Sequence, residues 1–547
     1  MAMVRGTVFD VSVHNSQYCT ATDVVLQRLE PTKMDPSRRT HCLKGTRSDV
    51  LQYAIHWVSV PEPQDDLLWI YGMAGSGKST ITTTLANYFR ETGQLGAFLF
   101  FNRDVEDQSD PTTTVRTMAY QIGTFHPRIG QLIADAIKST PSILSSPIYF
   151  QFKKLLVGPL SSLNDTDTRV VIIIDAIDES GTVEERGALV ELLSRSTKYL
   201  PFSTVRIIVS SREEVDIRSA FLKYPHIRAF ELSLTSSLIN DDIASYFRLH
   251  LHEIATQRAH LGANWPGDES IKALTERASG LFVWASTAIN FINGHDPRKR
   301  LAALLQEKLS AEAEIALDSL YRTALDMVDM WHDEDFVKDF RAIFGTILEL
   351  RNLLSSHAFD TLLGHRNGRP CIDTLARLSC VVSSSPKVRV VHPSFADFLR
   401  NRTRCGRDMW YFQPGKHNRT LATRCLKRLN AYLRRNMCNM SLSHDLGEEV
   451  LPEDVEYACI FWVEHVCSVR DGFQPLMILL DIFLCRHILH WFEAMSILGR
   501  SRDTIALLKS LLSWIIVSFS LMVFSHLLMS YLSDQRPLSN RTARACA

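Results

Sequence analysis

Short apolar runs alternate with stretches of helical periodicity up to residue 238. The runs, which we predict to be strands, are 67–71, 97–101, 169–175, 205–210 and 227–232. An unbroken apolar run is typical of a strand in a parallel sheet that helices cover on both faces. The pattern therefore predicts an α/β unit over residues 41–238, with a parallel sheet and helices on both of its faces.

After residue 238 the periodicity is mainly helical. We expect a helical domain at 239–310, a winged-helix-like domain at 311–400 and a helical bundle at 401–504. Two β-branched pieces, 381–382 and 388–391, flank the turn signal Ser385-Pro386 and predict a hairpin. Residues 1–40 show little periodicity, and we interpret them as a weakly ordered lead-in.

The segment 510–533, within a hydrophobic stretch at 505–534, has no charged residue. About 20 apolar residues suffice to cross a bilayer, so its length allows a transmembrane helix. Serines and His526 dilute it, and a buried helix remains an alternative. We expect a cytoplasmic protein, anchored in a membrane if this segment spans one.

A glycine-rich stretch lies between the first predicted strand and a predicted helix at 79–90. Its spacing fits G-x-x-x-x-G-K-[ST], which is typical of a phosphate-binding loop. Backbone N–H groups wrap a polyphosphate there, and glycines allow the close approach and the torsions. The predicted nucleotide-binding residues in this loop are Gly72, Gly75, Ser76, Gly77, Lys78, Ser79 and Thr80.

Two side chains of this loop have distinct predicted roles. Lys78 is expected to place its charge on the β- and γ-phosphates, and the Ser79 hydroxyl is expected to bind Mg²⁺. The N-terminus of the following helix adds a partial positive charge. The fold class that these features predict is the P-loop NTPase sheet, followed by the helical, winged-helix-like and bundle regions.

An acidic cluster follows the predicted strand 169–175. Open α/β sheets bind ligands at the carboxyl ends of their strands, so the cluster should face the phosphate loop. We expect Asp175 to hold Mg²⁺ through water, and Asp178 or Glu179 to orient the water that attacks the γ-phosphate. The alternative is a set of solvated acids in a surface turn.

Arg212 follows the predicted strand 205–210. An arginine at this edge could contact the γ-phosphate and sense its loss, although arginines are also common in structural ion pairs. Lys+Arg and Asp+Glu both total 60, so no overall charge points to nucleic acid. The 11 cysteines form no C-x-x-C pair, and no zinc spacing occurs.

These motifs together resemble the NACHT modules of the STAND class of P-loop NTPases, in the form found in fungal NACHT proteins. The resemblance covers roughly residues 42–500. Besides the loop and the acidic cluster, it rests on the segments Ser210-Ser211-Arg212, 280–285 and 392–399.

The resemblance implies a switch that rests with ADP and opens to form a homo-oligomer when ATP replaces it. It implies that Gly45, Thr46 and Arg47 close over the adenine and that His392 contacts the ADP β-phosphate. Without the resemblance, a histidine beside Pro393 would be interpreted as a packed structural residue.

This sequence departs from the wider class in two respects. It has Gly280-Leu281-Phe282 where relatives have Gly-x-Pro, so no proline contact to the base is assigned. No propeller or ankyrin period follows the switch, so the expected sensor is missing or replaced. The effector protein is not indicated.

The leading hypothesis is a signalling switch that binds Mg²⁺ and ATP or ADP, with GTP not excluded, and hydrolyses the triphosphate slowly. The alternative is a degenerate or truncated scaffold that holds nucleotide without an active cycle. A small-molecule kinase would need a lid with clustered arginines, and the sequence shows none.

Overall fold

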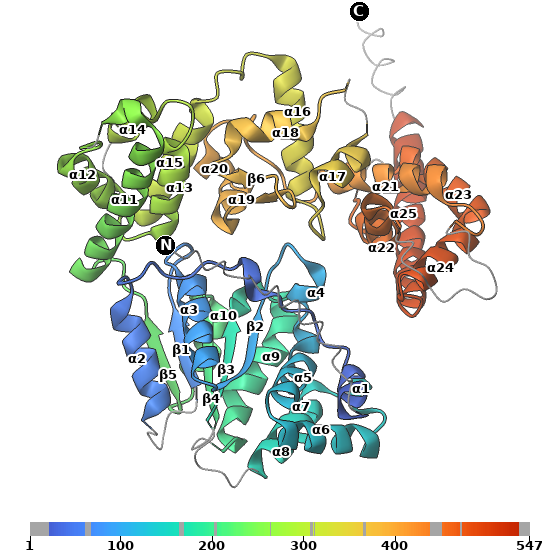
Figure 1. Ribbon diagram of the computed structural model, residues 1–547. Helices are drawn as coiled ribbons and strands as arrows, with labels where there is room; N and C mark the ends of the chain where they lie inside the picture. The colour runs from blue at the N-terminus through green and yellow to red at the C-terminus, as the bar shows by residue number, and fades with distance from the viewer. Residues whose placement is uncertain are drawn as a thin grey trace, which may run out of the picture. The chain divides into compact units, whose positions relative to one another are not determined.

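The computed structural model describes residues 21–60, 67–162, 169–201, 205–262, 264–306, 310, 312–364, 368–437, 451–470 and 473–534. Within helices, the side chains of residues 38, 196, 198 and 519–534 are outside this description. The chain forms two compact units, Met1–Ser233 and Leu234–Ala547 (Figure 1).

The first unit contains a five-stranded parallel sheet, as the apolar runs predict. Its strands are β1 (Leu67–Tyr71), β2 (Leu95–Phe100), β3 (Val170–Asp175), β4 (Val205–Ser211) and β5 (Ile227–Glu231). Their order is β2-β3-β4-β1-β5, so β4 separates the strand before the glycine-rich loop from the strand before the acidic cluster. The predicted α/β fold class is confirmed.

Helices cover both faces of this sheet (Figure 1). Because side chains alternate along a strand, Leu68 and Ile70 of β1 pack with α2 (Ser48–Ser59) and α3 (Lys78–Glu91). Leu67 and Trp69 pack in the opposite layer. That layer contains α5 (Thr114–Phe125), α6 (Pro127–Ser139), α9 (Val183–Ser196) and α10 (Val215–Phe221).

The segment before residue 41 contains structure that its weak periodicity does not predict. Helix α1 (Ala21–Gln27) contacts α5 and α6 and buries Val25 and Leu26, while Leu29 is buried just after it. A seven-residue helix has too few turns to show a periodic pattern. Other short helices of this unit are η1 (Pro36–Arg38), α4 (Glu106–Ser109), η2 (Pro111–Thr113), η3 (Ile143–Ser145), α7 (Ile148–Phe152), the π-helical η4 (Lys153–Val157), α8 (Gly158–Ser161), η5 (Ile177–Glu179) and η6 (Thr197–Tyr199).

The second unit is mainly helical, as predicted. Its helices up to the hairpin are α11 (Ser237–Gln257), η7 (Ala259–Leu261), α12 (Asp268–Ala278), α13 (Phe282–Ile292), α14 (Pro297–Gln306), α15 (Ala313–Asp326), α16 (Glu334–Ile347), α17 (Ser356–Leu363), α18 (Cys371–Leu375) and η8 (Ala376–Leu378). After the hairpin follow α19 (Pro393–Arg400), α20 (Arg402–Cys405), α21 (Asn418–Tyr432), α22 (Glu453–Cys467), α23 (Gln474–Arg486), α24 (Ile488–Ile497) and α25 (Asp503–Asp534).

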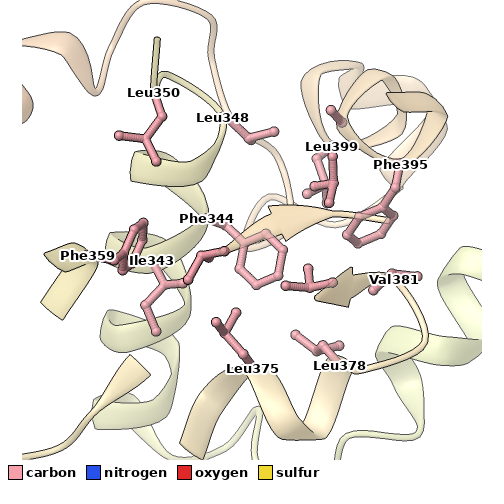
Figure 2. Packing of buried hydrophobic residues seen from close by; sticks show 14 of the residues in the cluster. Ile343, Phe344, Leu348, Leu350, Phe359, Leu375, Leu378, Val381, Phe395 and Leu399 are labelled. Carbon is pink, nitrogen blue, oxygen red and sulfur yellow. The ribbon is translucent and has the colours of Figure 1, made fainter. Parts of the chain in front are cut away.

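The predicted hairpin is present as antiparallel strands β6 (Val382–Ser383) and β7 (Arg389–Val390). Figure 2 shows Phe344 of α16 in the core beside this hairpin, with Phe395 and Leu399 of α19 nearby. Leu375 and Leu378 close the same cluster from below in this view. Apolar side chains from three helical segments and the hairpin therefore fix the position of α19.

The hydrophobic segment 510–533 lies in helix α25, and its side chains beyond Ser518 are outside the described residues. Among the described residues, no single helix has the length and apolar content to cross a membrane. The helices α23 and α24, bent by 76° at their junction, reach the required length and apolar content only when they are taken together. The expectation of a membrane segment therefore stays a prediction.

Candidate nucleotide-binding site

The glycine-rich loop connects β1 to α3. Gly75 and Gly77 have φ angles of +81° and +93°, which residues with a side chain rarely adopt. A Cβ on Gly72 would lie 3.1 Å from the Cβ of Leu232, so this position also favours glycine. The three glycines therefore suit the torsions and close packing of the loop.

Lys78 lies at the start of α3 and is buried. Its Nζ donates hydrogen bonds to the carbonyls of Gly72 and Met73, at 2.8 Å each. Burial lowers the pKa of Lys78 to about 8, although the charge of Asp178 opposes this shift. The carboxylates of Asp175 and Glu179 raise the pKa of Lys78 as well, so the lysine and the acidic cluster lie at one site.

Three hydroxyls accompany Lys78 in the loop. Thr80 Oγ1 donates to the Gly77 carbonyl at 2.7 Å, and Ser79 is exposed in the first turn of α3. The Ser76 Oγ is fully buried and has no hydrogen-bond partner among the described residues. A buried hydroxyl of this kind is costly unless a ligand oxygen pairs with it, which fits a phosphate site.

Asp175 ends β3 and is fully buried. The Ser210 hydroxyl at the end of β4 donates to its carboxylate, and the Arg39 guanidinium forms an ion pair with it. Ser210 Oγ also accepts the Ala176 N–H at 3.1 Å, where Ala176 has a φ of +56°. This turn directs the following acids away from the strand.

Asp178 and Glu179, which the sequence left as alternatives, have different environments. Asp178 accepts the backbone N–H of Arg212 at 3.0 Å, and its second oxygen lies 3.3 Å from Arg212 Nε. Glu179 accepts a long hydrogen bond of 3.5 Å from the Arg103 N–H. Burial, reinforced by the charge of Asp178, raises the pKa of Glu179 to about 7.

The Ser210-Ser211-Arg212 segment connects several of these groups. Ser210 holds Asp175, and Ser211 accepts a 2.8 Å hydrogen bond from Trp69 Nε1 on β1. Arg212 pairs with Asp178 and keeps about a quarter of its side chain exposed. The segment thus fixes the acidic cluster relative to the strand that leads into the phosphate loop.

The residues Gly45, Thr46 and Arg47 lie immediately before α2. Gly45 has a φ of +91°, Thr46 is buried, and Arg47 adopts a left-handed conformation at the helix N-cap. The Arg47 guanidinium donates to the Ser76 carbonyl. The structure therefore brings this segment to the phosphate loop, whereas its contact with adenine stays a prediction.

His392 belongs to the second unit and caps a helix. Its Nδ1 accepts the Ser394 N–H at 3.2 Å and lies 2.7 Å from the Ser394 Oγ. Ser394 Oγ in turn lies 2.7 Å from the Tyr321 hydroxyl. This geometry accounts for a structural role at the start of α19, and the predicted contact with a β-phosphate remains a prediction.

The groups at the end of β3 and in the loop suit Mg²⁺. This ion prefers oxygen ligands and keeps several waters, and Asp175 and Ser79 supply a carboxylate and a hydroxyl. Among the described residues, no group of three or more His, Cys, Asp or Glu side chains is arranged to hold a metal by itself. A nucleotide's phosphates and water would therefore supply the remaining ligands.

Arg39 also belongs to this site, although no sequence pattern indicates it. This residue lies in the stretch interpreted as a lead-in, 136 residues away from its partner Asp175. A single arginine outside any periodic pattern carries no signal of its own. Only the folded chain brings it to the acidic cluster.

Part of the first unit is similar to a known protein family. Residues 45–212 match the family described as Nephrocystin 3, N-terminal. A search of curated proteins found no match. Among solved structures, the Walker-type ATPase of Pyrococcus abyssi has 12% identity and a TM-score of 0.32, covering 67% of this chain and 99% of its own.

Two further structures have comparable similarity. Cdc6p from Pyrobaculum aerophilum has 12% identity and a TM-score of 0.29, covering 68% of this chain and 93% of its own. The Drosophila ORC bound to DNA has 12% identity and a TM-score of 0.28, covering 73% and 95%. The family match over residues 45–212, together with the loop and sheet described above, supports a P-loop NTPase fold for this part of the chain.

Proposed function

We propose that this protein is a switch driven by ATP and ADP. It binds Mg²⁺ and nucleotide at the phosphate loop, hydrolyses ATP slowly, and changes conformation or oligomerises in response. The observation that carries the proposal is Glu179, whose pKa of about 7 lies near neutral pH beside the buried Lys78 and Asp175. A general base works best when its pKa lies near the working pH.

Glu179 suits the attacking water better than Asp178. Both oxygens of Asp178 already interact with Arg212, at 3.0 and 3.3 Å, so that carboxylate is committed to positioning the arginine. Glu179 is half-buried, and its raised pKa lets it accept and return a proton near neutral pH. Mg²⁺, when bound, neutralises charge on the phosphates.

Arg212 provides the link between nucleotide and conformation. Its guanidinium is partly exposed and paired with Asp178, so a γ-phosphate would offer it a second anionic partner. A change of partner at Arg212 alters the contacts of the acidic cluster. A ligand can shift a conformational equilibrium only through such a difference in contacts between the two states.

Further assignments belong to this proposal. Gly45, Thr46 and Arg47 contact the adenine, and His392 contacts the β-phosphate of ADP in the resting state. The ATP-bound form assembles into a homo-oligomer and acts on a protein effector in the cytoplasm. The contact of Arg47 with the Ser76 carbonyl supports the first assignment, because it ties this segment to the phosphate loop.

The test is to purify the full chain, denature it, and identify the released nucleotide by chromatography. Stoichiometric ADP from the wild type, absent from Lys78→Ala, supports the switch. Light scattering of the wild type with Mg²⁺ and ATP should then show a larger species. A chain that holds nucleotide but neither hydrolyses ATP nor changes its mass would instead be a nucleotide-binding scaffold, and a chain that binds none would refute the site.

A further inference from the structure

The residues from Pro31 to Cys42 form a strap, the name we use for this segment. None of its described side chains is fully buried, although Met34 packs against the apolar clusters on both faces of the sheet. At one end, the Thr32 N–H donates to Thr117 Oγ1 of α5 at 3.0 Å. At the other end, the Cys42 N–H donates to Thr84 Oγ1 of α3 at 2.9 Å.

Arg39 lies between these two anchored ends and points at the acidic cluster. Its guanidinium forms an ion pair with the fully buried Asp175 carboxylate, and its Nε donates to Thr83 Oγ1 at 3.1 Å. The guanidinium carbon also lies 4.4 Å from the centroid of the Phe100 ring. A planar cation stacked on an aromatic ring and paired with a carboxylate is well held.

The rest of the strap is less closely packed. A cavity of about 670 Å³ lies between residues 31–34 of the strap and the edge strand β2. The strap does not supply every hydrogen bond of this edge strand, since the Phe98 N–H donates to Gln121 Oε1 of α5 at 2.8 Å. Polar contacts also hold this part of the strap, since the Thr32 hydroxyl lies 2.9 Å from Thr113 Oγ1 and Gln108 Nε2 donates to the Lys33 carbonyl at 3.4 Å. Arg39 adds an ion pair with a fully buried carboxylate to this attachment.

The Arg39 guanidinium and a hydrated Mg²⁺ ion are alternative partners for the same carboxylate. Asp175 is the acid to which the proposed function assigns Mg²⁺, and this inference rests on that assignment. A carboxylate that pairs with a guanidinium has its charge neutralised, and its oxygens are then less available to water held by a cation.

We propose that Arg39 competes with the magnesium of the bound nucleotide for Asp175, so that loading with Mg²⁺ and ATP releases the strap. The strap is thus a reporter of the loaded state that is built into the nucleotide-binding unit. Its release exposes a polar segment and changes one edge of the sheet.

The competition predicts how Arg39 changes the need for magnesium. Mg²⁺ must displace Arg39 in the wild type, and the apparent affinity falls by the fraction of molecules in which the site is free. Removing a hydrogen-bonded charge pair of this kind should lower the Mg²⁺ concentration for half-maximal nucleotide binding by about tenfold.

The first experiment titrates Mg²⁺ into the full chain with a fluorescent ATP analogue at fixed concentration. Arg39→Ala should need about tenfold less Mg²⁺ than the wild type, and Arg39→Lys should lie between them, because it keeps the charge without the planar fork. Lys33→Ala, a change at an exposed strap residue, is the matched control and should behave as the wild type.

The outcomes separate this inference from the proposed function. If the wild type binds the analogue with Mg²⁺ but Arg39→Ala needs as much Mg²⁺ or more, Arg39 merely positions Asp175 and the competition is refuted. If the wild type binds no analogue at any Mg²⁺ concentration, the proposed function itself fails. Far-UV circular dichroism of each variant establishes that it is folded.

A second experiment uses the wild type alone. Trypsin must take the Arg39 side chain into its own pocket, so cleavage after Arg39 requires that the guanidinium leave Asp175. Mg²⁺ with ATP should speed this cleavage several-fold relative to ATP with EDTA, with the products assigned by mass spectrometry. Equal or slower cleavage in the loaded protein would contradict release of the strap.

Discussion

Replacing Glu179 by glutamine tests the central assignment through both stability and rate. Burial raises the pKa of Glu179 from 4.5 to about 7. Each unit of pKa corresponds to 1.36 kcal/mol, so the charged form of Glu179 costs the folded state about 3 kcal/mol. Glutamine has nearly the same shape and removes that charge.

The sign of the pH dependence follows from proton binding. Below pH 4.5 the carboxyl is neutral in the folded and the unfolded chain, and its burial carries no charge penalty. Between pH 4.5 and about 7 only the folded chain keeps the proton, so stability falls as the pH rises. Glu179→Gln should therefore be more stable than the wild type by about 2–3 kcal/mol at pH 8, and by much less near pH 5.

The rate of ATP hydrolysis should have the complementary dependence. A base must be deprotonated to accept a proton, so the wild-type rate should rise about tenfold per pH unit below pH 7 and level off above it. Glu179→Gln should lose about 100-fold or more of this rate, within the usual contribution of general-base catalysis, while it still binds Mg²⁺ and ATP.

Two assays measure these effects. Phosphate release at saturating ATP between about pH 5.5 and 8.5 gives the rate profile. Urea denaturation at pH 5 and pH 8 gives the free energy of unfolding. The transition that shifts when Mg²⁺ and ATP are added belongs to the nucleotide-binding unit, and it is the one to measure. Glu184→Gln, at an exposed glutamate in the first turn of α9, is the control. A flat rate profile across pH 7, or a variant no more stable at pH 8, would refute the assignment.

Three other changes have defined outcomes. Lys78→Ala should abolish retention of nucleotide and remove the stabilisation that added ATP gives, which thermal unfolding with and without ATP will show; a retained ATP shift would count against the loop. Gly280→Ala should destabilise the second unit by about 3 kcal/mol or more, since Gly280 has a φ of +78° and a Cβ there would lie 2.2 Å from the Leu234 carbonyl oxygen; denaturation of wild type and variant measures this. His392→Leu should favour oligomers, whereas His392→Asn keeps a cap for α19 through Ser394; if both variants stay monomeric with ATP in light scattering, His392 serves the helix alone.

The local pattern of the sequence predicts the central strands and the phosphate loop. The strands β1 and β3 are apolar runs, and β4 is apolar from Ile207 to Val209, so these strands need no distant information to be found. Each was predicted within a residue or two of its bounds. The spacing from Gly72 to Ser79 likewise fixes the phosphate loop, because strand, glycines and helix are consecutive. Glycine torsions and helix starts depend on neighbouring residues, so the sequence carries them directly.

The acidic cluster illustrates a property that the sequence does not determine. Asp178 and Glu179 are adjacent carboxylates, and nothing in their order tells which one can act as a base. Arg212 follows β4 and forms an ion pair with Asp178, whereas burial raises the pKa of Glu179. Desolvation and charge act through space, so the pKa of each acid depends on segments far away in the chain.

The sequence by itself therefore determined the class of sheet, the loop and the set of acids that could serve it. Tertiary structure alone decided that Arg39 reaches Asp175 and that Arg212 pairs with Asp178. Arg39 and Asp175 are 136 residues apart, and an ion pair at that separation leaves no periodic trace. Local patterns record how a residue fits its own element, whereas contacts between elements exist only once the sheet and its helices have packed.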